Sequence, residues 1–109
     1  MEFDRHDRAR TILRESIATF IRREANTNPL ITVTNVTVSP SYEHAVVFFT
    51  TIPNEGEAGA LVFLKRKGSE LREYLKKNAR LKRIPHFDFQ IDYGERHRQK
   101  IDGIAQEIE

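Results

Sequence analysis

The chain has 109 residues, a length that fits one domain and leaves no room for a second hydrophobic core. It is 39% hydrophobic and 31% charged, and its seven Phe and three Tyr residues supply enough apolar bulk for it to fold. The absence of cysteine excludes a disulfide framework, a thiolate metal site and a cysteine nucleophile. No apolar run approaches the roughly 18 residues of a membrane span, and the acidic start is unlike a targeting peptide, so we expect a cytoplasmic protein without a membrane partner.

The net charge of +2 conceals an uneven distribution. Residues 65–83 contain nine basic and two acidic residues, which leaves nine basic and fourteen acidic residues in the rest of the chain. Clustered Lys and Arg side chains release condensed counterions when they bind phosphates. The segment therefore predicts a binding site for nucleic acid, an anionic membrane or an acidic protein.

The first half of the chain predicts a helix followed by two strands. From residue 5 to residue 25, apolar residues recur at the spacing of an amphipathic helix. Residues 31–38 alternate as in a strand, with a slip at Thr34-Asn35 that indicates a bulge. Residues 39–43 form a turn, and residues 45–52 predict a second strand, most simply antiparallel to the first.

A broken helix follows. Residues 60–64 begin a short helix, and helical spacing resumes over residues 71–81. Glycine inside a helix costs about 1 kcal/mol relative to alanine, so we expect a kink or a helix boundary at Gly68. Ser69 is placed to cap the second piece.

The last predicted elements complete the fold class. After Pro85, residues 87–93 alternate as a half-exposed third strand, and residues 101–108 allow a marginal helix. The order helix, strand, strand, helix, kink, helix, strand is most easily built as an α+β domain, with the helices on one face of a three-stranded sheet. This arrangement matches the type II KH fold. We expect a KH-like domain over residues 1–95 and a helical or frayed tail over residues 96–109.

No residue pattern indicates an enzyme or a cofactor. The four histidines lack metal-ligand spacing and favour surface or packing roles. The chain has no nucleophile elbow and no phosphate-binding loop for ATP or GTP. Asp88 and Asp92 are most simply the solvated side of the third strand. We therefore expect no catalytic residue, no metal and no cofactor.

Gly56-Glu57-Ala58-Gly59 has the G-x-x-G pattern with which KH loops clamp a nucleic-acid backbone. In the type II arrangement the clamp lies between the paired helices, whereas this tetrapeptide precedes both and carries a glutamate that would repel a phosphate. The position between the helices holds Arg66-Lys67-Gly68 instead. We expect the tetrapeptide not to bind nucleic acid.

Projected as a helix, the segment after Gly68 carries three stripes. One is apolar and faces the sheet, and a second alternates acidic and basic residues. The third contains no acid and consists of Arg72, Lys76, Arg80 and Arg83. Because unpaired like charges repel one another, this stripe is a better candidate for a phosphate-facing surface than for an ordinary solvated face.

The order and spacing of several segments resemble the ribosome-binding factor A family of small bacterial assembly factors for the 30S subunit. These segments are Glu2-Phe3, Val36-Thr37-Val38-Ser39-Pro40, Gly68 with Leu71-Arg72, and Leu81-Lys82-Arg83-Ile84-Pro85 before Phe87 and Phe89. The resemblance implies a type II KH fold in which an A-x-G kink replaces G-x-x-G. It also implies binding to small-subunit ribosomal RNA near the decoding region, and a role in late subunit maturation and cold adaptation.

The chain departs from that family pattern at several positions. Arg66 stands in place of the alanine of A-x-G, which adds a charge at the kink. His86 replaces the usual acid after the proline and can introduce a pH dependence, and Ser41 stands where aspartate is common.

We predict a monomeric, non-enzymatic factor in ribosome biogenesis and rRNA processing, which binds small-subunit ribosomal RNA and the free 30S subunit or its precursor. The residues expected to contact RNA are Lys65, Arg66, Lys67, Gly68, Arg72, Lys76, Lys77, Arg80, Lys82 and Arg83. A second hypothesis is a protein-protein adaptor that uses a sheet face with Val46 and Phe48 and docks an acidic partner on the basic block. A third, a small nuclease, lacks an acid-base pair.

Overall fold

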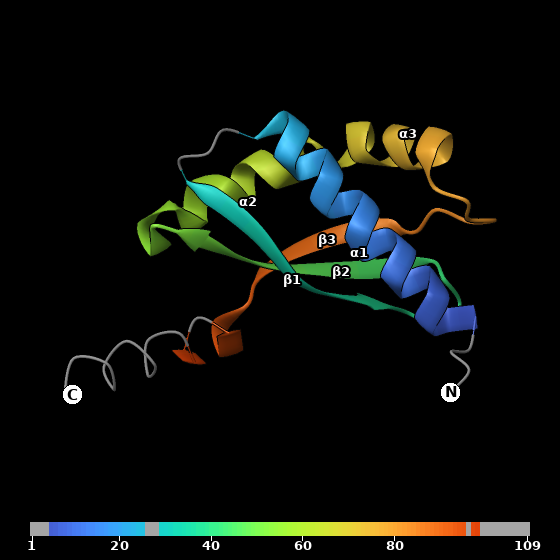
Figure 1. Ribbon diagram of the computed structural model, residues 1–109, viewed down its shortest axis with the longest axis horizontal. Coiled ribbons are helices and arrows are strands. Elements are labelled where there is room, and N and C mark those ends of the chain that lie inside the picture. Colours follow the sequence, from blue (N-terminus) through green and yellow to red (C-terminus); the bar gives the residue numbers. More distant parts are fainter. Residues whose placement is uncertain (1–4, 26–28, 96, 99–109) are drawn as a thin grey trace.

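The computed structural model describes residues 5–25, 29–95 and 97–98 (Figure 1). Its elements are α1 (Arg5–Glu24), β1 (Leu30–Val38), β2 (His44–Ile52), a short 3-10 helix η1 (Asn54–Gly56), α2 (Glu57–Arg66), α3 (Gly68–Asn78) and β3 (His86–Ile91). The predicted order of helices and strands is confirmed, and it is consistent with the type II KH-like arrangement. The helix predicted for residues 101–108 lies outside the described residues.

The three strands form one mixed sheet in the order β1-β2-β3. β1 pairs antiparallel with β2, and β3 pairs parallel with β2. The predicted bulge is present, because the register shifts between Val33 and Asn35. The Thr34 hydroxyl at the bulge donates a hydrogen bond to the Asp92 carboxylate just after β3, and this bond is the main cause that lowers the pKa of Asp92. This hydrogen bond therefore links the edge strand β1 to the residue that follows the other edge strand, β3.

Helices α1, α2 and α3 cover the same face of the sheet, and the core lies between them and the sheet (Figure 1). α1 packs on β1, while α2 packs on β3. The core side chains that are buried include Val36, Val47, Phe49 and Phe89 from the strands and Leu13, Ile17, Leu64, Leu71 and Leu75 from the helices. Phe49 is fully buried, whereas the adjacent Phe48 is only half-buried.

The predicted helix boundary at Gly68 is confirmed: α2 ends at Arg66, the chain bends at Lys67, and α3 begins at Gly68. The Lys67 N–H donates to the carbonyls of both Phe63 and Leu64, so the chain bends without leaving a near-helical conformation. The expectation that Ser69 caps α3 is wrong. Lys67 holds the N-cap position without a side-chain cap hydrogen bond, because this narrow bend leaves no extended residue from which a hydroxyl could cap the next turn.

α3 ends earlier than the periodicity predicts. The backbone of Ala79 is extended (φ −106°, ψ 139°), and the Asn78 side chain donates a 2.9 Å hydrogen bond to the Tyr74 carbonyl in the last turn. Pro85 disfavours a helical conformation at Ile84, and residues 79–85 form no helix before β3 begins at His86. Arg80 and Arg83 therefore do not continue the helical stripe of Arg72 and Lys76, and their projection onto that stripe is wrong.

The G-x-x-G tetrapeptide lies at the end of α2 that is distant from the bend. Gly56 ends η1, and a Cβ placed there would lie 2.5 Å from the Cβ of Pro29. Gly59 lies in the first turn of α2, where a Cβ would have no neighbour within 4 Å. Gly56 is therefore explained by its close packing against a rigid proline ring.

Alanine substitutions should separate these glycines by their effect on stability. Gly68 has no positive φ and open space around a Cβ, so Gly68→Ala should raise the free energy of unfolding by up to about 1 kcal/mol. Gly56→Ala should lower it by roughly 1 to 3 kcal/mol, because the proline ring cannot move aside cheaply. Urea titration followed by circular dichroism measures both changes, with Gly59→Ala as the control for an open site. Destabilisation by Gly68→Ala would show that the bend requires glycine.

Candidate nucleic-acid interface

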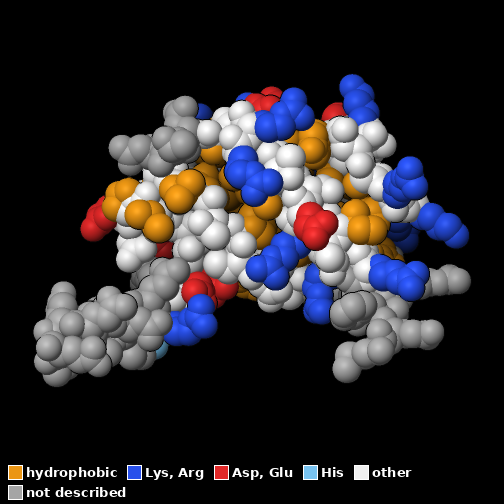
Figure 2. All heavy atoms as spheres, viewed as in Figure 1, with side chains coloured by type: hydrophobic (Ala, Val, Ile, Leu, Met, Phe, Trp, Pro, Cys, Tyr) orange, Lys and Arg blue, Asp and Glu red, His pale blue; other side chains and the backbone are white. Residues whose placement is uncertain are grey.

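The basic residues predicted to contact RNA lie along the path from the end of α2, through α3, to the start of β3. Figure 2 shows Lys and Arg side chains gathered at the right-hand end of the molecule, where Figure 1 places the end of α3 and the segment that follows it. Lys65 and Arg66 are exposed in the last turn of α2. The basic residues thus form two groups. A small group lies at the bend between α2 and α3, and a larger group lies at the end of the sheet where β2 and β3 begin.

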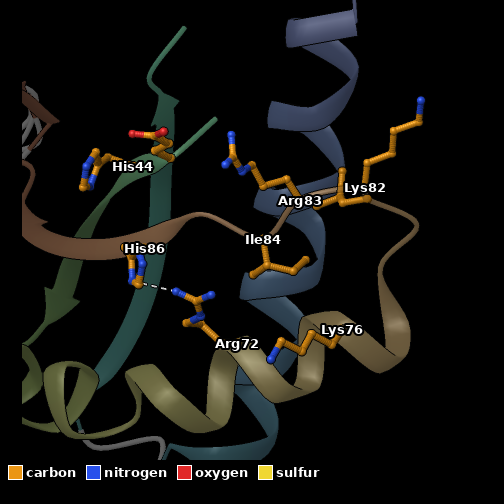
Figure 3. A pocket seen from close by; sticks show the side chains of 9 residues that line it. His44, Arg72, Lys76, Lys82, Arg83, Ile84 and His86 are labelled. Atoms are coloured by element: carbon orange, nitrogen blue, oxygen red, sulfur yellow. Dashed lines mark hydrogen bonds between the residues drawn. The ribbon is translucent and has the colours of Figure 1, made fainter. Parts of the chain in front are cut away.

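A hollow of about 700 Å³ lies at this end, between α3, residues 81–84 and the first residues of β2 and β3 (Figure 3). Its lining residues are Glu43, His44, Arg72, Lys76, Leu81, Lys82, Arg83, Ile84 and His86. Four of them are predicted RNA contacts, and Glu43 is the one acidic residue in this lining. We call this cavity the first hollow.

Arg72 projects from α3 across the first hollow to β3. One of its guanidinium nitrogens lies 2.6 Å from Nδ1 of His86, as the dashed line in Figure 3 marks. Because a guanidinium can only donate hydrogen bonds, Nδ1 is the acceptor and the ring proton is on Nε2. His44 is the register partner of His86 in the parallel pair, and the two ring centroids are 6.2 Å apart. Arg72 is therefore held by a neutral group.

Arg83 and the backbone fasten the hollow to the hairpin between β1 and β2. Arg83 donates a 3.2 Å hydrogen bond to the Ser41 carbonyl, and the His86 N–H donates to the Glu43 carbonyl at 2.9 Å. Figure 3 shows the Lys82 ammonium group directed away from Arg72. These hydrogen bonds thus hold together walls of the first hollow that come from segments far apart in the sequence.

A second hollow, of about 600 Å³, shares Leu81, Lys82 and Arg83 with the first. Its other lining residues are Arg8, Ala9, Ile12, Ser41, Tyr42 and Arg80. Sequence reasoning did not assign Arg8, His44 or His86 to the RNA site. Arg8 and His44 gave no signal in the sequence, and His86 stood out only as a departure from the family pattern, because only the fold brings these residues to the basic segment.

Lys67 and Lys77 lie apart from the first hollow, among acidic residues. The Lys67 ammonium is 3.1 Å from Glu70 and 3.8 Å from Glu24, and the hydrogen bond to Glu70 is the main cause that raises the pKa of Lys67. Lys77 shares a depression on the α1 side of α3 with Glu24, Glu70 and Glu73. Acidic groups thus compensate the charge of Lys67, and the depression beside Lys77 is lined by three glutamates and by Arg23.

The other predicted RNA contacts differ in whether the structure pairs them with an acidic residue. Lys76 pairs with Glu73 at 3.3 Å on the surface, an arrangement that contributes little to stability and can open for a ligand. Arg80 and Lys82 are exposed. Within residues 5–25, 29–95 and 97–98, no cluster of His, Asp or Glu could hold a metal ion, and no helix is long and apolar enough to cross a membrane.

Fold and site together define the class: a small α+β domain with KH-like element order and a strongly basic end. The model of the family described as ribosome-binding factor A matches residues 5–105. The chain belongs to the ribosome-binding factor A family. Its relatives include ribosome-binding factor A of Aromatoleum aromaticum, 34% identical over 97% of this chain and 89% of the relative. That of Xanthomonas axonopodis pv. citri is 30% identical over 98% of this chain and 84% of the relative.

Solved structures confirm the fold. The crystal structure of ribosome-binding factor A from Thermus thermophilus aligns with a TM-score of 0.71 at 24% identity, over 79% of this chain and 93% of that one. A Thermus thermophilus ribosome-binding factor A homology model, fitted into a cryo-EM map of a complex with the 30S subunit, aligns with a TM-score of 0.64 at 24% identity. That alignment covers 75% of this chain and 89% of that one. Membership of a family of ribosome-binding factors agrees with the expectation that the chain is not an enzyme.

Two lysine substitutions test this division of the charges. Lys67→Gln and Lys82→Gln each remove one positive charge, but only the Lys67 charge is compensated by carboxylates in the structure. Lys82→Gln should weaken binding to a structured RNA and reduce the slope of log K against log salt by about 0.7 to 0.9, the value for one lost phosphate contact. Lys67→Gln should change the slope by less than half as much. Fluorescence anisotropy at several salt concentrations measures both, and a larger effect at Lys67 would move the interface to the α1 side of α3.

Proposed function

We propose that the chain is a non-enzymatic assembly factor that binds the small ribosomal subunit and contacts small-subunit ribosomal RNA through its basic end. Family membership supports the first part, as does the homologue from Thermus thermophilus that was fitted into a complex with the 30S subunit. The observation that carries the second part is that Arg72, Lys76, Lys82 and Arg83 all line one hollow that has a single acidic residue in its lining.

Such a surface binds RNA by charge and shape. Arg and Lys side chains that meet phosphates release condensed counterions, and the affinity then falls steeply as salt rises. The hydrogen bonds from Arg83 to Ser41 and from His86 to Glu43 fix the hairpin against the basic segment. Arg83 and the backbone around the hollow are therefore held in place, which favours an RNA whose phosphates already have a matching arrangement.

The basic residues at the bend between α2 and α3 provide a second set of RNA contacts, in addition to those of the first hollow. Lys65 and Arg66 are exposed at the C-terminus of α2, where basic side chains also interact favourably with the helix dipole. This stabilising role exists whether or not RNA is bound. We therefore assign the larger part of the affinity to the first hollow and a smaller part to the bend.

The competing function is that of an adaptor for an acidic protein. The half-buried side chains of Val46 and Phe48 on the sheet face opposite the helices, with exposed Leu30 and Ile52 on adjacent positions of β1 and β2, favour some protein contact there. An adaptor would bind acidic polypeptide and ribosomal RNA with similar salt dependence, whereas the proposed factor should prefer ribosomal RNA.

Co-sedimentation with purified subunits tests the proposal. We expect the chain to sediment with 30S particles or their precursors in preference to 50S particles, without added nucleotide, and to be released as salt is raised. A polyglutamate of matched charge should not compete at equal charge concentration. Equal binding to both subunits would contradict the proposal, and so would a requirement for ATP or GTP. Displacement by polyglutamate would favour the adaptor.

A further inference from the structure

We propose that the first hollow binds one phosphate group of the RNA backbone, and that His86 is a positioning residue that holds Arg72 towards that phosphate. This inference rests on the proposed function. It adds the chemical group that the hollow recognises and a role for a histidine outside the basic block.

The bond between Arg72 and His86 leaves most of the guanidinium available. A guanidinium has five N–H groups in a planar fork, and one nitrogen is directed to Nδ1 of His86 at 2.6 Å. The remaining N–H groups can bind two phosphate oxygens side by side. Arg72 is only half-exposed, and anchoring it at both α3 and β3 removes much of the side-chain freedom that binding would otherwise have to restrict.

The neutrality of His86 decides the charge of the hollow. A carboxylate bound to Arg72 would compensate its charge, as Glu70 and Glu24 compensate that of Lys67 in the same chain. The imidazole fixes the guanidinium without compensating it. Arg83 is likewise held by a neutral group, the Ser41 carbonyl. Two arginines with uncompensated charge therefore line a hollow in which the one acidic residue is Glu43.

The rest of the lining favours the sugar-phosphate backbone over a base. Leu81 and Ile84 supply apolar surface on which a ribose can pack. No Phe, Tyr or Trp is among the residues that line this hollow. Of its two imidazole rings, that of His86 is bonded to Arg72, which leaves the ring of His44 as the one free surface in this lining on which a base could stack. His44 adds a further polar ring beside His86.

A pair of nearly isosteric substitutions tests the role of His86. His86→Asn keeps a neutral acceptor near the position of Nδ1, whereas His86→Asp places a carboxylate there. On 30S particles we expect His86→Asn to keep the wild-type affinity within about twofold. His86→Asp should lower the affinity by about three- to tenfold and reduce the salt slope by roughly one phosphate contact.

Gln90→Glu is the control for added charge. Gln90 is exposed on the same strand and the same face, four residues further on, at about 13 Å for roughly 3.3 Å per residue. The Gln90→Glu variant should change the affinity for 30S particles less than twofold and leave the slope of log K against log salt unchanged. Thermal unfolding of each variant shows whether the fold is retained.

The double variant Arg72→Gln with His86→Asp tests whether His86 acts through Arg72. If it does, the loss of affinity in the double variant is smaller than the product of the two single losses. Equal affinities of His86→Asn and His86→Asp, or losses that multiply, would overturn the phosphate site while the proposed function stands. Failure of the wild-type chain to bind 30S particles would overturn both.

Discussion

The parallel pairing of β3 with β2 is the constraint on which the rest of the structure depends. Parallel neighbours need a long crossover, because the chain must return from the end of one strand to the start of the next. Here the return runs through η1, α2, α3 and residues 79–85, and it covers the same sheet face as α1. The basic segment of the sequence lies along this return path. The crossover therefore carries it to the end of the sheet where β2 and β3 begin.

That end of the sheet collects groups that the sequence keeps apart. The hairpin supplies the Ser41 and Glu43 carbonyls, the starts of β2 and β3 supply two adjacent histidines, and α1 supplies Arg8. The two sides of α3 then differ in charge. The side towards α1 carries Lys67, whose charge two glutamates compensate, and the side towards the hollow carries Arg72, which is held by the imidazole of His86. The position of a basic residue in the fold, more than its presence in the basic block, decides whether its charge is available to RNA.

The residue patterns predicted the helices, the strands and the bulge because each depends on local spacing of apolar residues and on the twofold or 3.6-residue repeat. The end of α3 was missed since Arg80 and Arg83 continue a helical spacing that the return to β3 overrides. The cap at Ser69 failed because the bend at Lys67 remains nearly helical. Pairing of Lys67 with Glu24 and the approach of His86 to Arg72 join residues distant in the chain, so no periodicity could indicate them. The ten RNA contacts themselves stay predictions.

The central claim, that the basic end of the molecule faces small-subunit ribosomal RNA, is tested most directly by tethered cleavage. The chain has no cysteine, so a single cysteine can carry an iron-EDTA probe at a chosen position. Ser41 and Glu55 are both exposed and lie near opposite ends of the nine-residue strand β2, about 30 Å apart at roughly 3.3 Å per residue. In complexes with 30S particles, we expect the probe on Ser41→Cys to cleave ribosomal RNA strongly and the probe on Glu55→Cys to cleave it weakly. Strong cleavage from position 55 with none from position 41 would contradict the claim.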